Sequence, residues 1–220
     1  MSITSKFVTA ALALSVIGGV GAAGTLTANA ASTKCGAVCT SYYSVALGKG
    51  YLANVVNQAV QAGEPVNLAK ATDKNPGEDF APFDEGLVTD FNKAGIISAG
   101  LDKLYAELHV IEIQYVPAGS PSGLCVGVGS TPSAGTVVTL QACGVTARTT
   151  WIVEPVTTTA GTYDELFSGA TASNFQHPFS LTAGLKGPAP FVTTLVTEPL
   201  GAAPLNYQLW GDVTGVIATS

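Results

Sequence analysis

Four cysteines are the residues of this 220-residue chain that could form covalent cross-links or bind a metal. They are Cys35, Cys39, Cys125 and Cys143. An even number of cysteines in an exported chain indicates disulfides, and four cysteines allow three connectivities. Proximity along the sequence favours Cys35 with Cys39 and Cys125 with Cys143. A zinc site would need two close pairs or nearby histidines, and neither histidine has that spacing. We therefore expect disulfides and no metal site.

An acidic segment is the second candidate for chemistry. Between Asp73 and Asp90 the chain has one lysine and six acids, which are Asp73, Glu78, Asp79, Asp84, Glu85 and Asp90. Asp73, Asn75 and Asp79 could offer oxygen ligands to Ca²⁺. Pro76 and Gly77 depart from the pattern of an EF-hand loop, so the segment favours a solvated acidic turn over a calcium site.

Catalytic groups are sparse. A serine nucleophile needs a base, and His109 and His177 are the only imidazoles. No G-x-S-x-G sequence is present, since GSPSG at 119–123 has a central proline. The carboxylate pairs at 84–85 and 164–165 are adjacent in sequence and would point apart in an extended chain, whereas a glycosidase needs two carboxylates that face each other. We predict that the protein is not an enzyme and uses no cofactor.

The first thirty residues have the order of a secretory signal peptide. Lys6 is their only charge, an apolar stretch runs from Phe7 to Val20, and Ala28-Asn29-Ala30 matches a cleavage site. The apolar stretch is shorter than the roughly 20 residues that span a membrane. The sequence therefore predicts a signal peptide at 1–30, removal of that segment, and a secreted extracellular product that is free of the membrane.

The composition of the remaining chain limits the classes of molecule that it could bind. Only 11% of the residues are charged, the formal net charge is −6 and Arg148 is the single arginine. An apolar content of 47% is too high for a disordered chain, and the absence of a Lys/Arg cluster argues against nucleic acid binding. We expect a folded monomer whose partner is a glycan or an extracellular protein.

Short alternating segments dominate the rest of the chain. Apolar residues alternate with period 2 in four segments bounded by turn residues, which are 65–68, 111–116, 137–140 and 191–196. One helix is expected at Leu101–Val110, where Leu101, Leu104, Tyr105 and Leu108 share a face. The pattern indicates an all-β sandwich or barrel with one short helical or irregular insertion.

Internal similarity favours three repeats. Gly63–Phe80 aligns with Gly135–Trp151, so that Val66 matches Val138 and Leu68 matches Leu140, and a looser third copy runs from Ala189 to Trp210. A short strand precedes each copy, beginning at 51, 123 and 178. Because one unit cannot cover its own apolar face, three units are needed to close a barrel. These features predict a β-trefoil at 41–220, with repeats at about 41–85, 109–156 and 163–215, after a disulfide-pinned segment at 31–40.

The segment from Ser122 to Val153 resembles one repeat of a ricin B-chain-type lectin domain, whose repeats read C-L-D-V, then G-x-x-V-x-L-x-x-C, then Q-x-W. Gln208-Leu209-Trp210 is a literal Q-x-W. The resemblance also implies a Cys125–Cys143 disulfide. The chain as a whole resembles a group of small exported bacterial proteins without an assigned activity.

The resemblance implies a sugar site of the kind found in these lectins, in which the Asp of C-L-D-V, an aromatic residue and an Asn before Q-x-W hold the sugar. Here the Asp position is Gly127 in the second repeat and near Ser180 in the third, while Asn54 could replace it in the first. We expect Phe80, Trp151 and Trp210 to be core residues, and Gln208 to hydrogen-bond within a turn more readily than to a ligand. The candidate sugar contacts are Asn54, Glu78, Asp79, Tyr207 and Gln208.

These observations predict a secreted, non-catalytic, lectin-like protein that binds carbohydrate or cell-wall glycan weakly. The alternative is a protein-binding or structural β-trefoil, similar to an inhibitor, that has lost its sugar sites. Ten of the fifteen acids lie between Glu64 and Glu112, so the first repeat is the expected place for polar recognition.

Overall fold

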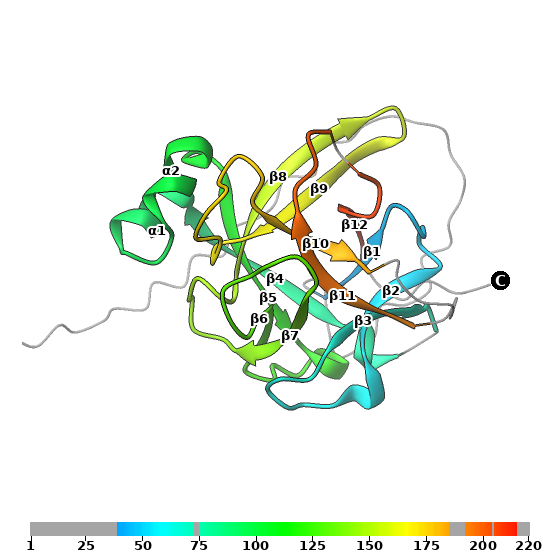
Figure 1. The fold of residues 1–220 in the computed structure, drawn as a ribbon. Helices are drawn as coiled ribbons and strands as arrows, with labels where there is room; N and C mark the ends of the chain where they lie inside the picture. The colour runs from blue at the N-terminus through cyan, green and yellow to red at the C-terminus, as the bar shows by residue number, and fades with distance from the viewer. Residues whose placement is uncertain (1–38, 73–74, 185–191, 204, 215–220) are drawn as a thin grey trace, which may run out of the picture.

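The computed structural model describes residues 39–72, 75–184, 192–203 and 205–214, which form an all-β fold (Figure 1). Twelve strands belong to one sheet. They fall into three groups of four, which we call the first, second and third unit. The first unit has β1 (Thr40–Ser44), β2 (Tyr51–Val55), β3 (Val66–Lys70) and β4 (Phe80–Leu87); the second has β5 (His109–Tyr115), β6 (Leu124–Val128), β7 (Thr136–Ala142) and β8 (Thr150–Thr158); the third has β9 (Gly161–Ser168), β10 (Phe179–Ala183), β11 (Val192–Pro199) and β12 (Leu209–Thr214).

The outer strands of the three units close a barrel. In each unit the first strand pairs with the fourth, and the fourth strand pairs with the first strand of the next unit, all antiparallel. The middle strands form three hairpins, β2–β3, β6–β7 and β10–β11. The hairpins meet because β11 pairs with both β3 and β7, and Pro65 bridges to Thr139. This arrangement is trefoil-like, in agreement with the sequence prediction.

Equivalent positions of the three units fill one core. Phe80, Trp151 and Trp210 each lie at most 1% exposed in the same apolar cluster, as expected for core residues. Trp151 Nε1 donates to Val126 O at 2.9 Å, and Trp210 Nε1 donates to Leu181 O at 2.9 Å. The repeated bond shows that Val126 and Leu181 are equivalent, and it satisfies an indole donor that would be costly to bury unpaired.

The registers of the hairpins refine the alignment of the repeats. Val66 pairs with Val55 and Val138 pairs with Val128, which supports the match between Val66 and Val138. In the third unit the equivalent of Val138 is Leu195, which pairs with Ala183. The same register makes Thr182, rather than Ser180, the equivalent of Gly127 and Asn54.

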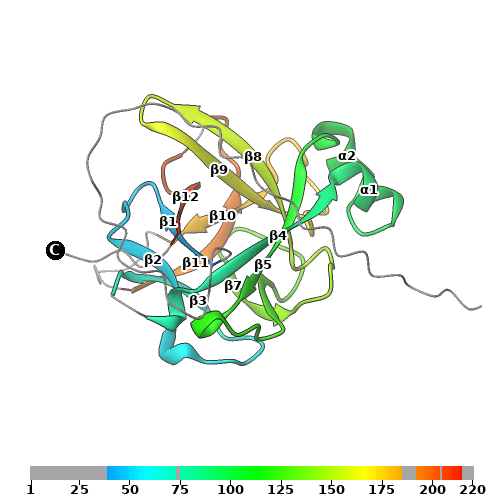
Figure 2. The same cartoon turned by 180° about the vertical axis from the view of Figure 1, so that it is seen from behind.

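A helical insertion follows β4 and stands to one side of the barrel (Figures 1 and 2). It contains α1 (Val88–Lys93) and α2 (Ala99–Tyr105), and its apolar residues form a second cluster with Ile152 and Phe167 on the outer face of the sheet. The expected helix at Leu101–Val110 is wrong at its C-terminal end. His109 and Val110 belong to β5, because the chain there pairs with both β4 and β8. Tertiary strand pairing thus overrides the local helical period.

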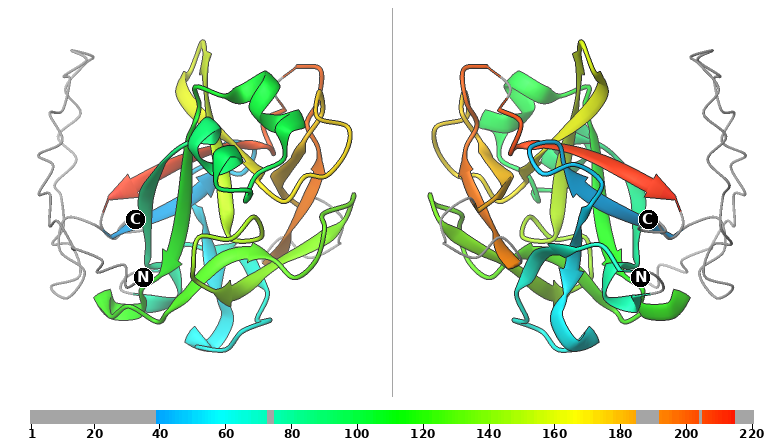
Figure 3. Two further views of the ribbon diagram at one scale, coloured as in Figure 1. Left: turned by 90° about the vertical axis from the view of Figure 1, so that its left-hand side faces the viewer. Right: turned by 90° about the vertical axis from the view of Figure 1, so that its right-hand side faces the viewer.

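The remaining short elements are 3₁₀ turns: η2 (Val56–Gln58), η3 (Pro76–Glu78) and η4 (Pro117–Gly119). The long β8–β9 hairpin projects beyond the neighbouring strands in the side views (Figure 3). Among the described residues, no helix has the length and apolar character needed to cross a membrane. The predicted signal peptide at 1–30, the segment 31–38 and Asp73 lie outside the described residues.

Candidate functional site

One hollow of the described surface lies in the third unit. Its volume is about 810 Å³, within the range of small-ligand sites. Its walls come from β10, β11 and the segment that leads into β12. We call it the third-unit hollow, and the side chains that matter most in it are Thr182, Thr194, Glu198 and Tyr207.

Strand alternation places the side chains of β11 in this hollow. Leu195 and Thr197 are buried, at 1% and 0% exposed, because they face inward. Successive side chains of a strand point to opposite faces, so Thr194 and Glu198 face outward. Thr182 of β10 lies beside this face, since it pairs with Val196. The hairpin therefore presents the Thr194 hydroxyl and the Glu198 carboxylate on a single surface, whereas the Thr182 hydroxyl is buried and donates to Ser180 O at 2.9 Å.

A buried glutamine holds the opposite wall in place. Gln208 is fully buried, and its Nε2 donates to Pro199 O at 3.1 Å and to Thr182 Oγ1 at 3.4 Å. Its Oε1 accepts from Gly201 N at 3.4 Å. The backbone is fixed as well, because Ala183 N donates to Tyr207 O at 2.9 Å. Gln208 therefore binds the protein itself, which leaves the half-buried Tyr207 as the aromatic side chain of the wall.

The equivalent region of the first unit is closed by its own polar network. Glu78 is 4% exposed, and its Oε1 accepts from Asn75 Nδ2 at 2.9 Å, Thr72 N at 3.3 Å and Asn54 Nδ2 at 3.5 Å. Burial raises the pKa of Glu78, and these hydrogen bonds oppose the rise. A Cβ added to Gly77 would lie 2.6 Å from Val55 O, so the turn packs directly onto β2.

Asp79 is the residue after Glu78, and its side chain contacts the η4 turn instead of this network. Its Oδ2 accepts from Ala118 N at 3.0 Å in the η4 turn. Burial raises the pKa of Asp79 to about 6, although the hydrogen bond opposes the rise. The side chain is half-buried. Asp79 therefore titrates close to neutral pH at the junction between the first and second units.

In the second unit backbone lies close to the equivalent strand position. A Cβ on Gly127 would lie 2.5 Å from Arg148 O, which accepts from Val128 N at 2.9 Å. A carboxylate at the position of Gly127 is therefore excluded by the approach of the chain. The backbone bond itself is shared with the third unit, where Ala183 N donates to Tyr207 O, so the restriction at Gly127 concerns the side-chain position alone.

The predicted sugar contacts divide into two separate sets. Asn54 and Glu78 are in contact in the first unit with Asp79 next in sequence, and Tyr207 and Gln208 are neighbours in the third. Asn54, Glu78 and Gln208 are buried and hydrogen-bonded within the protein. The sequence prediction did not include Thr182, Thr194 or Glu198. The alternation of Thr194, Val196 and Glu198 along one segment was the available signal, but it becomes meaningful only once the exposed face of β11 is known.

The Cys125–Cys143 disulfide is confirmed, with an S–S distance of 2.04 Å. Glu112 lies near both sulfur atoms. The sulfur atoms bond each other and so are not thiolate ligands, and the Glu112 carboxylate accepts from Val145 N at 2.9 Å. Cys39 is also disulfide-bonded, and its predicted partner Cys35 lies outside the described residues.

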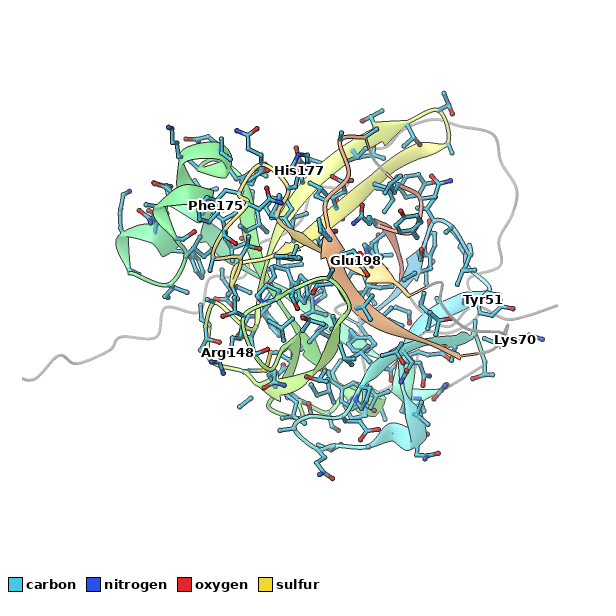
Figure 4. The ribbon with its side chains drawn as sticks, viewed as in Figure 1. Tyr51, Lys70, Arg148, Phe175, His177 and Glu198 are labelled. Carbon is cyan, nitrogen blue, oxygen red and sulfur yellow. A yellow bond between two sulfur atoms is a disulfide. The ribbon has the colours of Figure 1, made fainter. Side chains whose placement is uncertain are left out.

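Each histidine has a polar partner on another segment of the chain. His109 Nδ1 lies 2.9 Å from Asp84 Oδ2 in an exposed ion pair, and His177 Nδ1 lies 3.0 Å from Leu200 O. His177 and Phe175 lie on the loop before β10 (Figure 4). These contacts fit structural roles at the surface.

Two glutamates that the sequence analysis did not single out as a pair lie opposite each other on β8 and β9. Glu154 pairs with Glu165 in the strand register, and Glu165 is 5% exposed. Burial, followed by the nearby Glu154 carboxylate, raises the pKa of Glu165 to about 7. Tyr105 of α2 lies close to both. The pair is at the edge of the helical insertion and is separate from the third-unit hollow.

Comparisons with known proteins bear on the fold. No protein-family model matches the chain, and no curated protein matches it. A designed three-fold symmetric protein, ThreeFoil, has a TM-score of 0.54 and 12% identity over 80% of this chain and 97% of its own. A mosquitocidal holotoxin has a TM-score of 0.53 and 11% identity over 80% of this chain and 17% of its own. The cytolethal distending toxin of Actinobacillus actinomycetemcomitans has a TM-score of 0.50 and 12% identity over 86% of this chain and 97% of its own.

These likenesses are to solved structures of low sequence identity, so they show the fold alone. They agree with the resemblance to ricin B-chain-type β-trefoil domains that the repeats indicate. The local chemistry of the hollow has to carry any statement about function.

Proposed function

We propose that this protein is a secreted, non-catalytic carbohydrate-binding protein with a ricin B-type β-trefoil, and that the third-unit hollow is its binding site. The observation that carries the proposal is the presence of Tyr207 and Glu198 on walls of one hollow. An aromatic side chain can pack against the apolar face of a sugar ring, and a carboxylate accepts hydrogen bonds from its hydroxyls.

The surroundings support this proposal. The hydroxyl of Thr194 adds a polar group to a mainly apolar hollow, which is the usual composition of a small-molecule site. Thr194 Oγ1 donates to Asn67 Oδ1 at 3.0 Å, so its orientation is set before a ligand arrives. A site whose groups are already ordered loses less conformational entropy on binding.

The experiment is a glycan array with the protein beginning at Ala31 and with its Tyr207→Ala variant. We expect retention on a subset of oligosaccharides by the parent protein, and loss of at least about ten-fold in affinity in the variant, because the stacking surface is removed. Tyr51→Ala is the matched control, since Tyr51 is a partly exposed tyrosine on β2 that lies away from Glu198 (Figure 4).

Two results would count against carbohydrate binding at this place. One is the absence of retention on every immobilised glycan. The other is equal binding by the Tyr207→Ala variant, which would move the site elsewhere. If instead a pull-down from culture medium recovers one defined protein and its capture survives Tyr207→Ala, the alternative protein-binding role replaces the proposal.

A further inference from the structure

The charge of the third-unit hollow suggests which saccharides it would accept. Glu198 is the only charged side chain among the described residues that line it. Among the described residues, the ion pairs are Lys93–Asp90 and His109–Asp84, so Glu198 has no cationic partner in that part of the chain. The carboxylate is half-buried at the end of β11. Its negative charge is therefore uncompensated within the site that the structure describes.

The distribution of cations over the protein reinforces this point. The chain has nine Lys and Arg residues against fifteen Asp and Glu residues. Arg148, the single arginine, and Lys70 both lie well away from Glu198 (Figure 4). A ligand that carries a carboxylate or sulfate would meet repulsion from Glu198 and would find no described cation in the hollow to offset it.

The second wall of the hollow is also suited to a cation. Tyr207 lines this wall while it packs against the apolar core, and a cation over the face of an aromatic ring is attracted by the quadrupole of the ring. An ammonium group held between Tyr207 and Glu198 would gain both interactions. Glu198 and Tyr207 are both partly buried, and electrostatic interactions are stronger at partly buried sites than in bulk water.

Resting on the proposed function, we propose that the third-unit hollow selects amino sugars with a free ammonium group, and that Glu198 determines this specificity. Glu198 pairs with the ammonium, Tyr207 stacks on the ring, and the Thr194 oxygen, whose proton goes to Asn67, accepts from a sugar hydroxyl. Acetylation of the amine removes the charge and weakens binding, and a uronic acid reverses the charge and is excluded.

The test compares three tetrasaccharides by calorimetry at low and at physiological salt. The probes are a glucosamine tetramer, an N-acetylglucosamine tetramer and a galacturonic acid tetramer. We expect the glucosamine tetramer to bind about five- to ten-fold more tightly than the acetylated one, with a preference that shrinks as salt rises. The uronic acid tetramer should not bind.

Two variants separate the role of Glu198 from the net charge of the protein. Glu198→Gln keeps the shape of the side chain and removes its charge, so the ratio of the affinities for the free-amine and N-acetylated tetramers should fall to about one. Glu107→Gln removes the same charge from an exposed position of the helical insertion and should leave the preference intact.

The outcomes distinguish the inference from the proposed function. Binding of the acetylated or acidic tetramer as tightly as the free amine, with binding still lost in Tyr207→Ala, overturns the amino-sugar specificity alone. An unchanged preference in Glu198→Gln overturns the role of this residue. Failure of all three probes, together with failure of the glycan array, overturns both proposals.

Discussion

The first and third units of this protein use equivalent positions in opposite ways. In the first unit Asn54 and Glu78 hydrogen-bond to each other and to the turn that covers them. In the third unit Thr182 and Gln208 occupy the same positions and are also in contact, but the hollow above them stays open. The comparison teaches that an intact strand framework does not fix whether a unit can bind a ligand. The packing of the segment before the fourth strand distinguishes the two units.

The buried carboxylate of the first unit accounts for this closure. Glu78 has four donors within 3.5 Å, from Asn54, Asn75 and two atoms of Thr72. Hydrogen bonds to a charged acceptor stabilise the folded protein more than bonds to a neutral acceptor. If the acceptor is removed, each buried donor loses its partner and the folded protein is destabilised. The third unit has a neutral amide, Gln208, at the same place. Gln208 fixes the segment before β12 through its hydrogen bonds to Pro199 O and Gly201 N, and the hollow beside it remains open.

The largest expected effect is on the closed unit. Glu78→Ala should lower the free energy of unfolding by about 3 kcal/mol, because buried amide donors of Asn54 and Asn75 lose their acceptor. Oligosaccharide affinity should be unchanged. Urea denaturation followed by tryptophan fluorescence measures the first quantity. A variant that keeps its stability but loses saccharide binding would place the ligand site in the first unit and reverse the comparison.

A smaller loss of stability is expected in the open unit, and here binding should change as well. Gln208→Ala removes three hydrogen bonds and should cost about 2 kcal/mol of unfolding free energy. The variant should also weaken oligosaccharide binding several-fold, because the segment that carries Tyr207 loses the hydrogen bonds that hold it in place. The same denaturation and calorimetry experiments apply. If Gln208→Ala and Glu78→Ala have identical consequences for binding, the two units do not differ in the way described.

The smallest expected effect is a change of folding stability with pH, which arises from Asp79 at the junction of the first and second units. The pKa of Asp79 is raised from 3.8 to about 6, so the folded protein holds this proton more tightly than the unfolded chain does. Its stabilising contribution is therefore present below about pH 4 and is lost as the pH rises through 6. Since the side chain is half-exposed, we expect a change of about 1 kcal/mol between these limits.

Asp79→Asn tests this expectation. The variant should be more stable than the parent at pH 7 and equal to it at pH 4, which reduces the slope of melting temperature against pH. Asp90→Asn removes an exposed carboxylate of α1 and serves as the control for loss of surface charge. A parallel shift of the Asp79→Asn protein at both pH values would contradict the raised pKa.

The framework was predictable from the sequence because core positions recur. The match of Val66 with Val138 follows from spacing alone, and the hairpin registers agree with it. The third copy could be aligned only loosely, since Thr197 stands where the other units have leucine and Leu195 is the equivalent of Val138. Without that register, Thr182 could not be recognised as the equivalent of Asn54.

The site was less predictable than the fold. Tyr207 and Gln208 stood out through the Q-x-W motif, but the acidic composition of the first repeat directed attention to Asn54 and Glu78. Whether a carboxylate is used for a ligand or for the protein depends on which donors the folded chain brings to it. Glu198 was missed because its importance comes from the hollow that β11 forms with the following segment at Tyr207, which only the folded chain shows.

The most direct test of the central claim is chemical-shift mapping of the ¹⁵N-labelled protein during titration with the glucosamine tetramer. We predict saturable shifts at the backbone amides of Thr182, Thr194, Glu198 and Tyr207, with the amides of Asn54 and Glu78 unchanged. Saturable shifts centred on Asn54 and Glu78, or the absence of saturable shifts at the third-unit hollow with a saccharide that the protein binds, would contradict it.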